Sequence, residues 1–182
     1  MDAHLDLTLP PTCPELHQGS NANWDNASFA LYSMVDLSSE DLDKLITALN
    51  QEWKQDMTDE AMDLVRTPTV YDFQGKSLRD VVQAHVELDK ELTPSDYGGV
   101  EGDIHWYPTA FVVVTAHEWK EKGVLLVYVD VEEKECPLDK FFFHVDVANV
   151  MLSSLSFGEG GPSLSKLNWE LGHGVLACTC ME

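Results

Sequence analysis

Three short apolar segments dominate the second half of the chain: FVVVTA at 111–116, VLLVYV at 124–129 and FFFHV at 141–145. Each has the length of a β-strand and is rich in β-branched or aromatic residues, and charged connections separate them. Consecutive strands joined by short polar loops usually pair as antiparallel neighbours, so the segments predict a three-strand meander. Continuous apolar runs indicate that both faces of the sheet are covered, by helices on one side and by the N-terminal arm or the last helix on the other.

The residues that precede this meander predict one more strand and a helix. FALYSMV at 29–35 has a strand-like composition and ends at Asp36. Ser38, with Asp41 three residues later, offers a helix-capping pair. After this pair, apolar side chains recur at helical spacing as far as Trp53, which makes this segment the clearest helix of the chain.

Three further helices are expected. The first of them stops before Pro68, because the residue that precedes a proline avoids helical backbone angles. The second begins at a Ser77 cap with Asp80 in the reciprocal position, and the third can be capped by Asp146. Their expected ranges are 58–66, 77–86 and 146–158. Together these elements predict an α+β fold, a single domain whose mainly antiparallel sheet (the three-strand meander plus the N-terminal strand) packs against helices.

The composition divides the chain into three parts. Residues 1–27 contain three prolines, no Lys or Arg and no periodic pattern, so we expect a mobile or loosely packed N-terminal arm. Residues 28–160 form the single α+β domain, because a typical domain of about 100 to 200 residues leaves little of the chain for a second core. Residues 161–182 are expected to pack on this domain as a C-terminal tail.

The protein is strongly acidic, since 11 Lys and Arg against 32 Asp and Glu give its 182 residues a formal charge of −21. Such a surface repels nucleic-acid phosphates and anionic lipids, which argues against direct nucleic-acid binding and against membrane binding. No apolar run approaches the roughly 18 residues of a membrane span, and the N-terminus lacks a signal-peptide pattern, so a cytoplasmic location is expected. Four cysteines are too few for a disulfide framework and are expected to be reduced.

The apolar segments at 110–114, 123–130 and 140–145, closed by VANVMLSSLSF at 147–157, resemble a family of small acidic proteins. That family is of mostly bacterial and some fungal origin and is known only as a domain of unknown function. The likeness covers residues 28–160 and leaves out both tails. The resemblance implies one compact domain. Because no activity is established for the family, it assigns no functional residue.

His105, Trp106 and Tyr107 bring together an imidazole and two large aromatic rings just after an acidic, glycine-rich segment. Aromatic walls with one titratable group suit a small-ligand pocket, and His117 is a further candidate for its lining. The alternative is an aromatic anchor packed at the entrance of a strand. His85, on an apolar helical face, is interpreted as a core histidine rather than a ligand.

The expected helices between residues 40 and 63 carry eight acids and two lysines, which makes them the most acidic helical surface of the chain. This surface is either a solvated face or the place where a basic partner docks with electrostatically steered association. The candidate partner-binding residues are Asp41, Asp43, Glu52, Asp56, Asp59 and Glu60.

Cys178 and Cys180, with His173 nearby, supply soft ligands that could hold a metal ion together with Cys13 or Cys136. Thiolate sites are usually built from Cys-x-x-Cys pairs, so two terminal thiols without a metal are the expectation. A redox role would need a nearby cation to activate a thiol, and the C-terminal end of the sequence contains no Lys or Arg. The sequence therefore predicts neither a metal site nor a cofactor.

No catalytic constellation is recognisable, so we expect a binding protein rather than an enzyme. The first hypothesis is a non-enzymatic protein-binding module, of the inhibitor or immunity type, that engages a basic partner through the acidic helices. The alternative is a small-ligand-binding protein or enzyme that uses a pocket near His105, Trp106 and Tyr107. A third hypothesis is a nucleic-acid mimic that occupies the groove of a nucleic-acid-binding protein.

Overall fold

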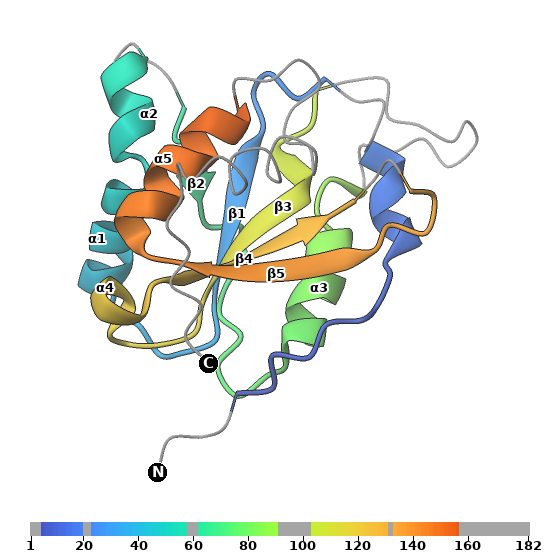
Figure 1. Cartoon of the computed structure of the whole chain (residues 1–182), viewed down its shortest axis with the longest axis horizontal. Helices are drawn as coiled ribbons and strands as arrows, with labels where there is room; N and C mark the ends of the chain where they lie inside the picture. Colours follow the sequence, from blue (N-terminus) through green and yellow to red (C-terminus); the bar gives the residue numbers. More distant parts are fainter. Residues whose placement is uncertain (1–4, 20–22, 58–61, 91–102, 131–132, 157–182) are drawn as a thin grey trace.

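The computed structural model describes residues 5–19, 23–57, 62–90, 103–130 and 133–156. Over these ranges the chain forms a five-stranded sheet with helices on both of its faces (Figure 1). The predicted α+β class is therefore confirmed. The expected C-terminal tail lies outside the described residues.

The sheet is mixed, with parallel and antiparallel pairs. Its strands are Ser28–Ser33 (β1), Val65–Arg66 (β2), Trp106–Val114 (β3), Val124–Val129 (β4) and Leu138–Phe143 (β5), in the order β2-β1-β3-β4-β5. β3, β4 and β5 pair as antiparallel neighbours, which confirms the meander. β1 pairs in parallel with both β2 and β3, so the prediction of a mainly antiparallel sheet was wrong for these strands. The reason is the connection, because a chain that crosses over through helices returns its next strand in the same direction.

Two of the helices begin at the caps that the sequence predicts. The helices are Pro14–Gly19 (η1, a 3-10 helix), Ser39–Leu49 (α1), Gln51–Asp56 (α2), Leu78–Val86 (α3), Trp119–Lys122 (α4) and Val145–Ser156 (α5). Before α1, the Ser38 hydroxyl accepts a hydrogen bond from the N–H of Asp41 at 3.1 Å. Before α3, Ser77 and Asp80 form a full capping box, in which each side chain accepts a hydrogen bond from the backbone of the other.

Asn50 explains two differences from the predicted helices. Its side-chain N–H groups donate to the carbonyl oxygens of Ile46 (2.9 Å) and Val65 (2.8 Å), and its Oδ1 accepts the N–H of Val65 at 2.9 Å. This buried amide ends α1 and holds Val65 in an extended conformation, so the clearest predicted helix divides into α1 and α2. The prediction of a helix over 58–66 was wrong over its last five residues, which contain β2, and its first four lie outside the described residues.

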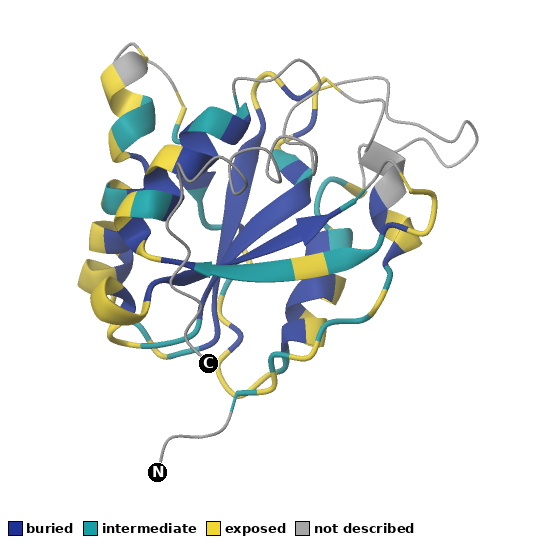
Figure 2. Cartoon of the chain, in the orientation of Figure 1, coloured by how far each residue is buried: buried dark blue, intermediate teal, exposed yellow. Residues whose placement is uncertain are grey.

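Different elements cover the two faces of the sheet (Figure 1). The first face, which includes Phe29 and Val112, is covered by α1, α2 and α5. The second face, which includes Tyr32 and Val113, is covered by α3 and by the N-terminal residues 5–16. Figure 2 shows that the central strands are buried and that exposed residues lie on the outer sides of the helices. The prediction that both faces are covered is confirmed.

Residues 5–16 of the expected N-terminal arm pack on the second face, whereas Trp24 and Ala27 at its end belong to the first-face cluster. Cys13 and Leu16 are buried there, and three leucines pack against the same cluster: Leu5, Leu7 and Leu9. The N–H of Leu78, at the start of α3, donates to the carbonyl oxygen of Asp6 at 2.8 Å. The arm and α3 therefore cover the second face together.

Candidate functional site

An open groove of about 820 Å³ lies where the C-terminal end of α3 meets the β2–α3 connection and the start of β3. Its apolar lining residues are Pro68, Val70, Ala84, Leu88 and Trp106. Its polar lining residues are Thr69, Glu87, Asp89, Lys90 and His105. The volume falls within the range of roughly 300 to 1,000 Å³ that is typical of small-ligand sites.

Asp89 follows the end of α3 in a left-handed backbone conformation, with a φ angle of 55°. Asp and Asn adopt this conformation more readily than other non-glycine residues. Its Oδ2 atom accepts hydrogen bonds from the N–H groups of His105 at 2.8 Å and Trp106 at 2.9 Å. The side chain is 12% exposed. The turn after α3 thus fixes a carboxylate against the start of β3, inside the groove.

His105 faces this carboxylate. Its Nδ1 atom lies 3.3 Å from Oδ1 of Asp89, and its side chain is 62% exposed. The contact is an ion pair when the ring is protonated. Because Nδ1 faces Asp89, the Nε2 atom on the other side of the ring is directed away from the carboxylate. Asp89 therefore orients the imidazole at the edge of the groove.

Arg66 supplies a positive charge against Trp106. Its guanidinium carbon lies 4.3 Å from the centroid of the indole, which is the distance of a cation–π contact. Its Nε donates to the hydroxyl of Ser28 at 2.9 Å, and its Nη2 donates to the carbonyl oxygen of His105 at 3.1 Å. Partial burial lowers the pKa of Arg66, and two nearby carboxylates oppose this shift. The arginine fixes the position of the indole and of the strand that carries it.

His85 lies in the core of the second face rather than in the groove. Its Nε2 lies 3.0 Å from the carbonyl oxygen of Tyr107, and its Nδ1 lies 3.1 Å from the hydroxyl of Tyr32. A carbonyl oxygen can only accept, so Nε2 carries the proton and the Tyr32 hydroxyl donates to Nδ1. Burial lowers the pKa of His85 to about 4. The neutral ring connects α3 to β1 and β3.

The four residues expected to line a pocket do not gather in one place. His105 and Trp106 line the groove together. Tyr107 points to the first face, where its ring centroid lies 4.5 Å from that of Phe29, because successive side chains of a strand alternate between faces. His117 is exposed and follows the opposite end of β3. Tyr107 and His117 therefore do not belong to the groove.

Sequence reasoning did not single out Asp89 or Arg66. A weak signal for Asp89 existed, because it follows directly after the apolar pattern of α3, where a chain often turns through a left-handed residue. For Arg66 no local signal exists. Its contacts with Ser28 and His105 join positions that lie 38 and 39 residues apart.

The acidic surface expected over 40–63 is described in part. Asp41 and Asp43 are exposed on α1, and Glu52 on α2 is partly buried. Three of its candidate residues lie outside the description: the side chain of Asp56, and the whole of Asp59 and Glu60.

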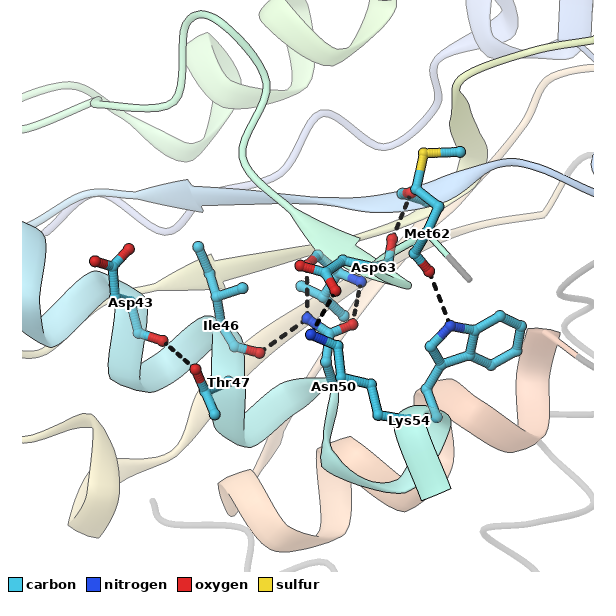
Figure 3. Close-up of polar contacts among 10 residues, drawn as sticks. Asp43, Ile46, Thr47, Asn50, Lys54, Met62 and Asp63 are labelled. Carbon is cyan, nitrogen blue, oxygen red and sulfur yellow. Dashed lines mark hydrogen bonds and ion pairs between the residues drawn. The ribbon is translucent and has the colours of Figure 1, made fainter. Parts of the chain in front are cut away.

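Two lysines, Lys44 and Lys54, lie among these acids, and Figure 3 shows Lys54 beside Asp63. The Nζ of Lys44 lies 2.7 Å from Glu40 and 3.9 Å from Asp41, and the Nζ of Lys54 lies 2.7 Å from Asp63. A second groove, of about 670 Å³, runs along α1 and α2 and is lined by both lysines and by two of the acids. The described part of this surface is therefore mixed in charge rather than uniformly acidic.

Two of the four cysteines, Cys13 and Cys136, are buried on the second face. The other expected soft ligands lie outside the described residues: His173, Cys178 and Cys180. The described part of the chain contains no group of three or more His, Cys, Asp or Glu that could hold a metal ion. Of the helices that the structure describes, none is long and apolar enough to cross a membrane.

Comparisons with protein-family models, with curated proteins and with solved structures each found no match for the chain. The resemblance to a family of small acidic proteins stays a prediction. The geometry of the groove at Asp89, His105 and Trp106 and the charge of the protein are therefore the features that bear on function.

Proposed function

We propose that the protein binds a small organic molecule that combines an apolar body with a positively charged amine, in the groove between α3 and β3. The observation that carries the proposal is Asp89, whose carboxylate is held among apolar walls by two backbone N–H groups and faces His105. A carboxylate that is already fixed in place offers an ammonium group a charge-assisted hydrogen bond. Because the Asp89 side chain is already held in place, ligand binding costs little further side-chain entropy.

The apolar walls of the groove support the same ligand class. Val70 is 63% exposed, the highest fraction among the exposed large hydrophobic residues of the described chain. Leu88 and Trp106, both partly buried, line the same groove. Covering such surface contributes about 25 cal/mol per Å² of apolar area. The apolar body of the ligand would lie against these three side chains.

The charges around the groove favour a cation over an anion. The net charge of −21 raises the local concentration of cations at the protein surface. Glu87 and Lys90 lie 2.9 Å apart at the groove and offset each other. Arg66 stacks against Trp106 outside the lining, and its charge offsets part of the negative charge of Asp89. Asp89 is then the group that selects the charged end of the ligand.

A matched ligand series tests this proposal. Phenethylamine, 2-phenylethanol and phenylacetate share an aromatic body and differ in the charge of their polar end. Each is added during thermal unfolding, because a ligand that binds only the native state raises the melting temperature. At about 100 times its Kd, the amine should raise the melting temperature by roughly 5 to 10 °C. The alcohol should act more weakly, and the carboxylate should have no effect.

Three variants locate the binding site. Trp106→Ala should reduce the effect of both the amine and the alcohol, because it removes part of the apolar wall. Asp89→Asn should remove the preference for the amine over the alcohol. Thr47→Ala, on the exposed side of α1, is the matched control and should behave like the parent protein. The proposal is wrong if phenethylamine does not raise the melting temperature of the parent protein. It is also wrong if phenethylamine raises the melting temperature of both groove variants by as much as that of the parent.

We also propose, as a second candidate, that a basic protein docks on α1 and α2. Asp41 and Asp43 favour this function, since both are exposed, and Asp43 lines the groove along these helices. The high negative charge of the chain would steer a basic protein to the surface. Such an association weakens steeply as salt is added, because the surface charges are screened.

Affinity capture with the full-length protein tests the second candidate. A basic partner should be recovered at low salt, be released at high salt, and be lost with the double variant Asp41→Asn/Asp43→Asn. Asp89→Asn serves as the control and should still recover the partner. Failure to recover a basic protein, or equal recovery by the double variant, contradicts this function. Displacement of DNA from a recovered partner would support the nucleic-acid mimic instead.

A further inference from the structure

The two buried cysteines lie close together beside a short antiparallel bridge. Thr12 and Pro137 form an isolated antiparallel bridge between the N-terminal arm and the β4–β5 connection. On one side of this bridge, the N–H of Cys13 donates to the carbonyl oxygen of Cys136 at 2.9 Å. On the other side, the N–H of Leu138 donates to the carbonyl oxygen of Pro11 in the arm at 3.3 Å. Cys13 and Cys136 are therefore neighbours beside this bridge, joined by one backbone hydrogen bond, and Cys136 itself has a left-handed φ angle of 49°.

The hydrogen bond between the two residues brings their backbones within the range that a disulfide can span. A single backbone hydrogen bond of 2.9 Å joins the two residues, which places their Cα atoms about 5 Å apart, near the spacing of neighbouring antiparallel residues. Disulfides span Cα separations of roughly 4.4 to 6.8 Å. Both cysteines also belong to the same buried cluster on the second face. Neither the sequence spacing nor any local motif indicates this pair.

We propose that Cys13 and Cys136 form a reversible disulfide that fastens the N-terminal arm to the β4–β5 connection. The oxidant is a low-molecular-weight disulfide of the glutathione type. One protein thiolate attacks the oxidant and forms a mixed disulfide, which releases the first small thiolate. The second protein thiolate then attacks the mixed disulfide and releases the second small thiolate. Two protein thiols are oxidised, one small disulfide is reduced, and the two protein protons are taken up by the released thiolates.

Cys13 is the thiol that reacts first. Cys13 is 6% exposed, whereas Cys136 is fully buried. The Cys13 thiol donates a hydrogen bond to the Glu15 carboxylate at 3.4 Å. Burial, helped by Glu15, raises the pKa of Cys13 to about 12, and burial also raises the pKa of Cys136. Because the thiolate is the attacking species, the reaction should be slow at pH 7 and about tenfold faster per pH unit up to pH 9.

The disulfide would close a loop of more than 100 residues. Closing so long a loop restricts the unfolded chain strongly. The melting temperature of the oxidised protein should therefore exceed that of the reduced protein by roughly 10 °C.

The experiment treats the folded, full-length protein with oxidised glutathione at pH 8.5 and maps its disulfides by non-reducing peptide mass spectrometry. The expected result is a Cys13–Cys136 link, a raised melting temperature, and reversal of both by dithiothreitol. Cys178→Ser/Cys180→Ser removes the other two thiols and should leave the link and the stabilisation intact. Cys13→Ser and Cys136→Ser should each abolish both.

Three results would overturn the proposal. One is that Cys13 and Cys136 stay reduced while the protein is folded and link only in urea. Another is that the dominant link in the parent protein involves Cys178 or Cys180. The last is that the double variant forms the Cys13–Cys136 link without any rise in melting temperature.

Discussion

The two faces of the sheet use different chemistry. On the first face, under α1, α2 and α5, large apolar side chains pack around two buried amides, those of Asn50 and Asn149. On the second face, under α3 and the N-terminal arm, the buried set includes His85, Tyr32 and two thiols. The groove that we propose as the ligand site lies beside α3, and Trp106 packs against the second-face cluster.

This difference indicates that the first face supplies stability and that the second face responds to solution conditions. Apolar packing and neutral amides do not respond to pH or to oxidants, so the first face contributes constant stability. A buried imidazole and two thiols make the second face sensitive to both. If this account is right, substitutions on the first face should change stability equally at all pH values. Substitutions on the second face should change the response to protons, oxidants or ligand.

The largest effect is expected from Asn50→Ala on the first face. The variant loses three hydrogen bonds and leaves the buried N–H and carbonyl groups of Val65 without the partners that the amide provides. We expect a loss of about 4 kcal/mol in the free energy of unfolding, measured by urea denaturation. Thr47→Ala, one turn earlier and exposed, is the matched control and should change it by less than about 0.5 kcal/mol (Figure 3). If the loss of unfolding free energy in Asn50→Ala varied with pH, the first face would not contribute the same stability at all pH values.

The next effect is the pH dependence that His85 produces on the second face. Its pKa is lowered from 6.5 to about 4 in the folded protein, so the unfolded chain binds the proton first as pH falls. The stabilisation is therefore complete above pH 6.5 and is lost as pH falls towards 4. The loss should reach about 3 kcal/mol at pH 4.

His85→Gln isolates this contribution, because the many carboxylates titrate in both proteins. The difference in unfolding free energy between the parent and His85→Gln should shrink by about 3 kcal/mol from pH 8 to pH 4. An NMR titration of the imidazole checks the same point directly and should give a midpoint near pH 4. A midpoint near 6.5 would show that the ring is not buried as described.

A smaller effect is expected at Asp89, beside the groove. Asp89→Ala removes the acceptor of two backbone N–H groups and places alanine at a φ angle of 55°. We expect a loss of about 2 kcal/mol in the free energy of unfolding. Asp89→Asn keeps a side-chain oxygen and tolerates this backbone conformation, so it should cost less than about 1 kcal/mol. Equal losses for the two variants would mean that the carboxylate charge, rather than the turn, holds this end of α3.

The smallest effect on stability is expected at Val70. Its side chain is 63% exposed, so Val70→Ser should change the free energy of unfolding by less than about 0.5 kcal/mol. The same variant should weaken binding of the amine several-fold, measured by isothermal titration calorimetry, because it removes part of the apolar wall. An unchanged affinity for the amine would show that Val70 does not contact the ligand.

The meander was predictable because each of its three strands contains a run of β-branched or aromatic residues, and short connections join them. The parallel pairing of β1 with β3 could not be predicted from the sequence, since it depends on how the helical connection between the strands folds back onto the sheet. The prediction of a helix over 58–66 was wrong over its described residues for a related reason. Its pattern is compatible with a helix, but the amide of Asn50, 15 residues away, imposes an extended backbone on Val65.

The candidate site was predictable only where its residues are adjacent in sequence. His105 and Trp106 are neighbours and were identified together, whereas strand alternation sends Tyr107 to the other face. Asp89 reaches them across 16 and 17 residues, and Arg66 reaches His105 across 39. Contacts of this range are fixed by the packing of the elements, which a local pattern does not encode.

The most direct test of the central claim is an NMR titration of the ¹⁵N-labelled protein with phenethylamine. We expect chemical-shift changes to concentrate on the backbone amides of Val70, Leu88 and Asp89 and on the indole N–H of Trp106, while the amides of α1 stay unchanged. Changes centred on α1 and α2, or no change at millimolar amine, would contradict it.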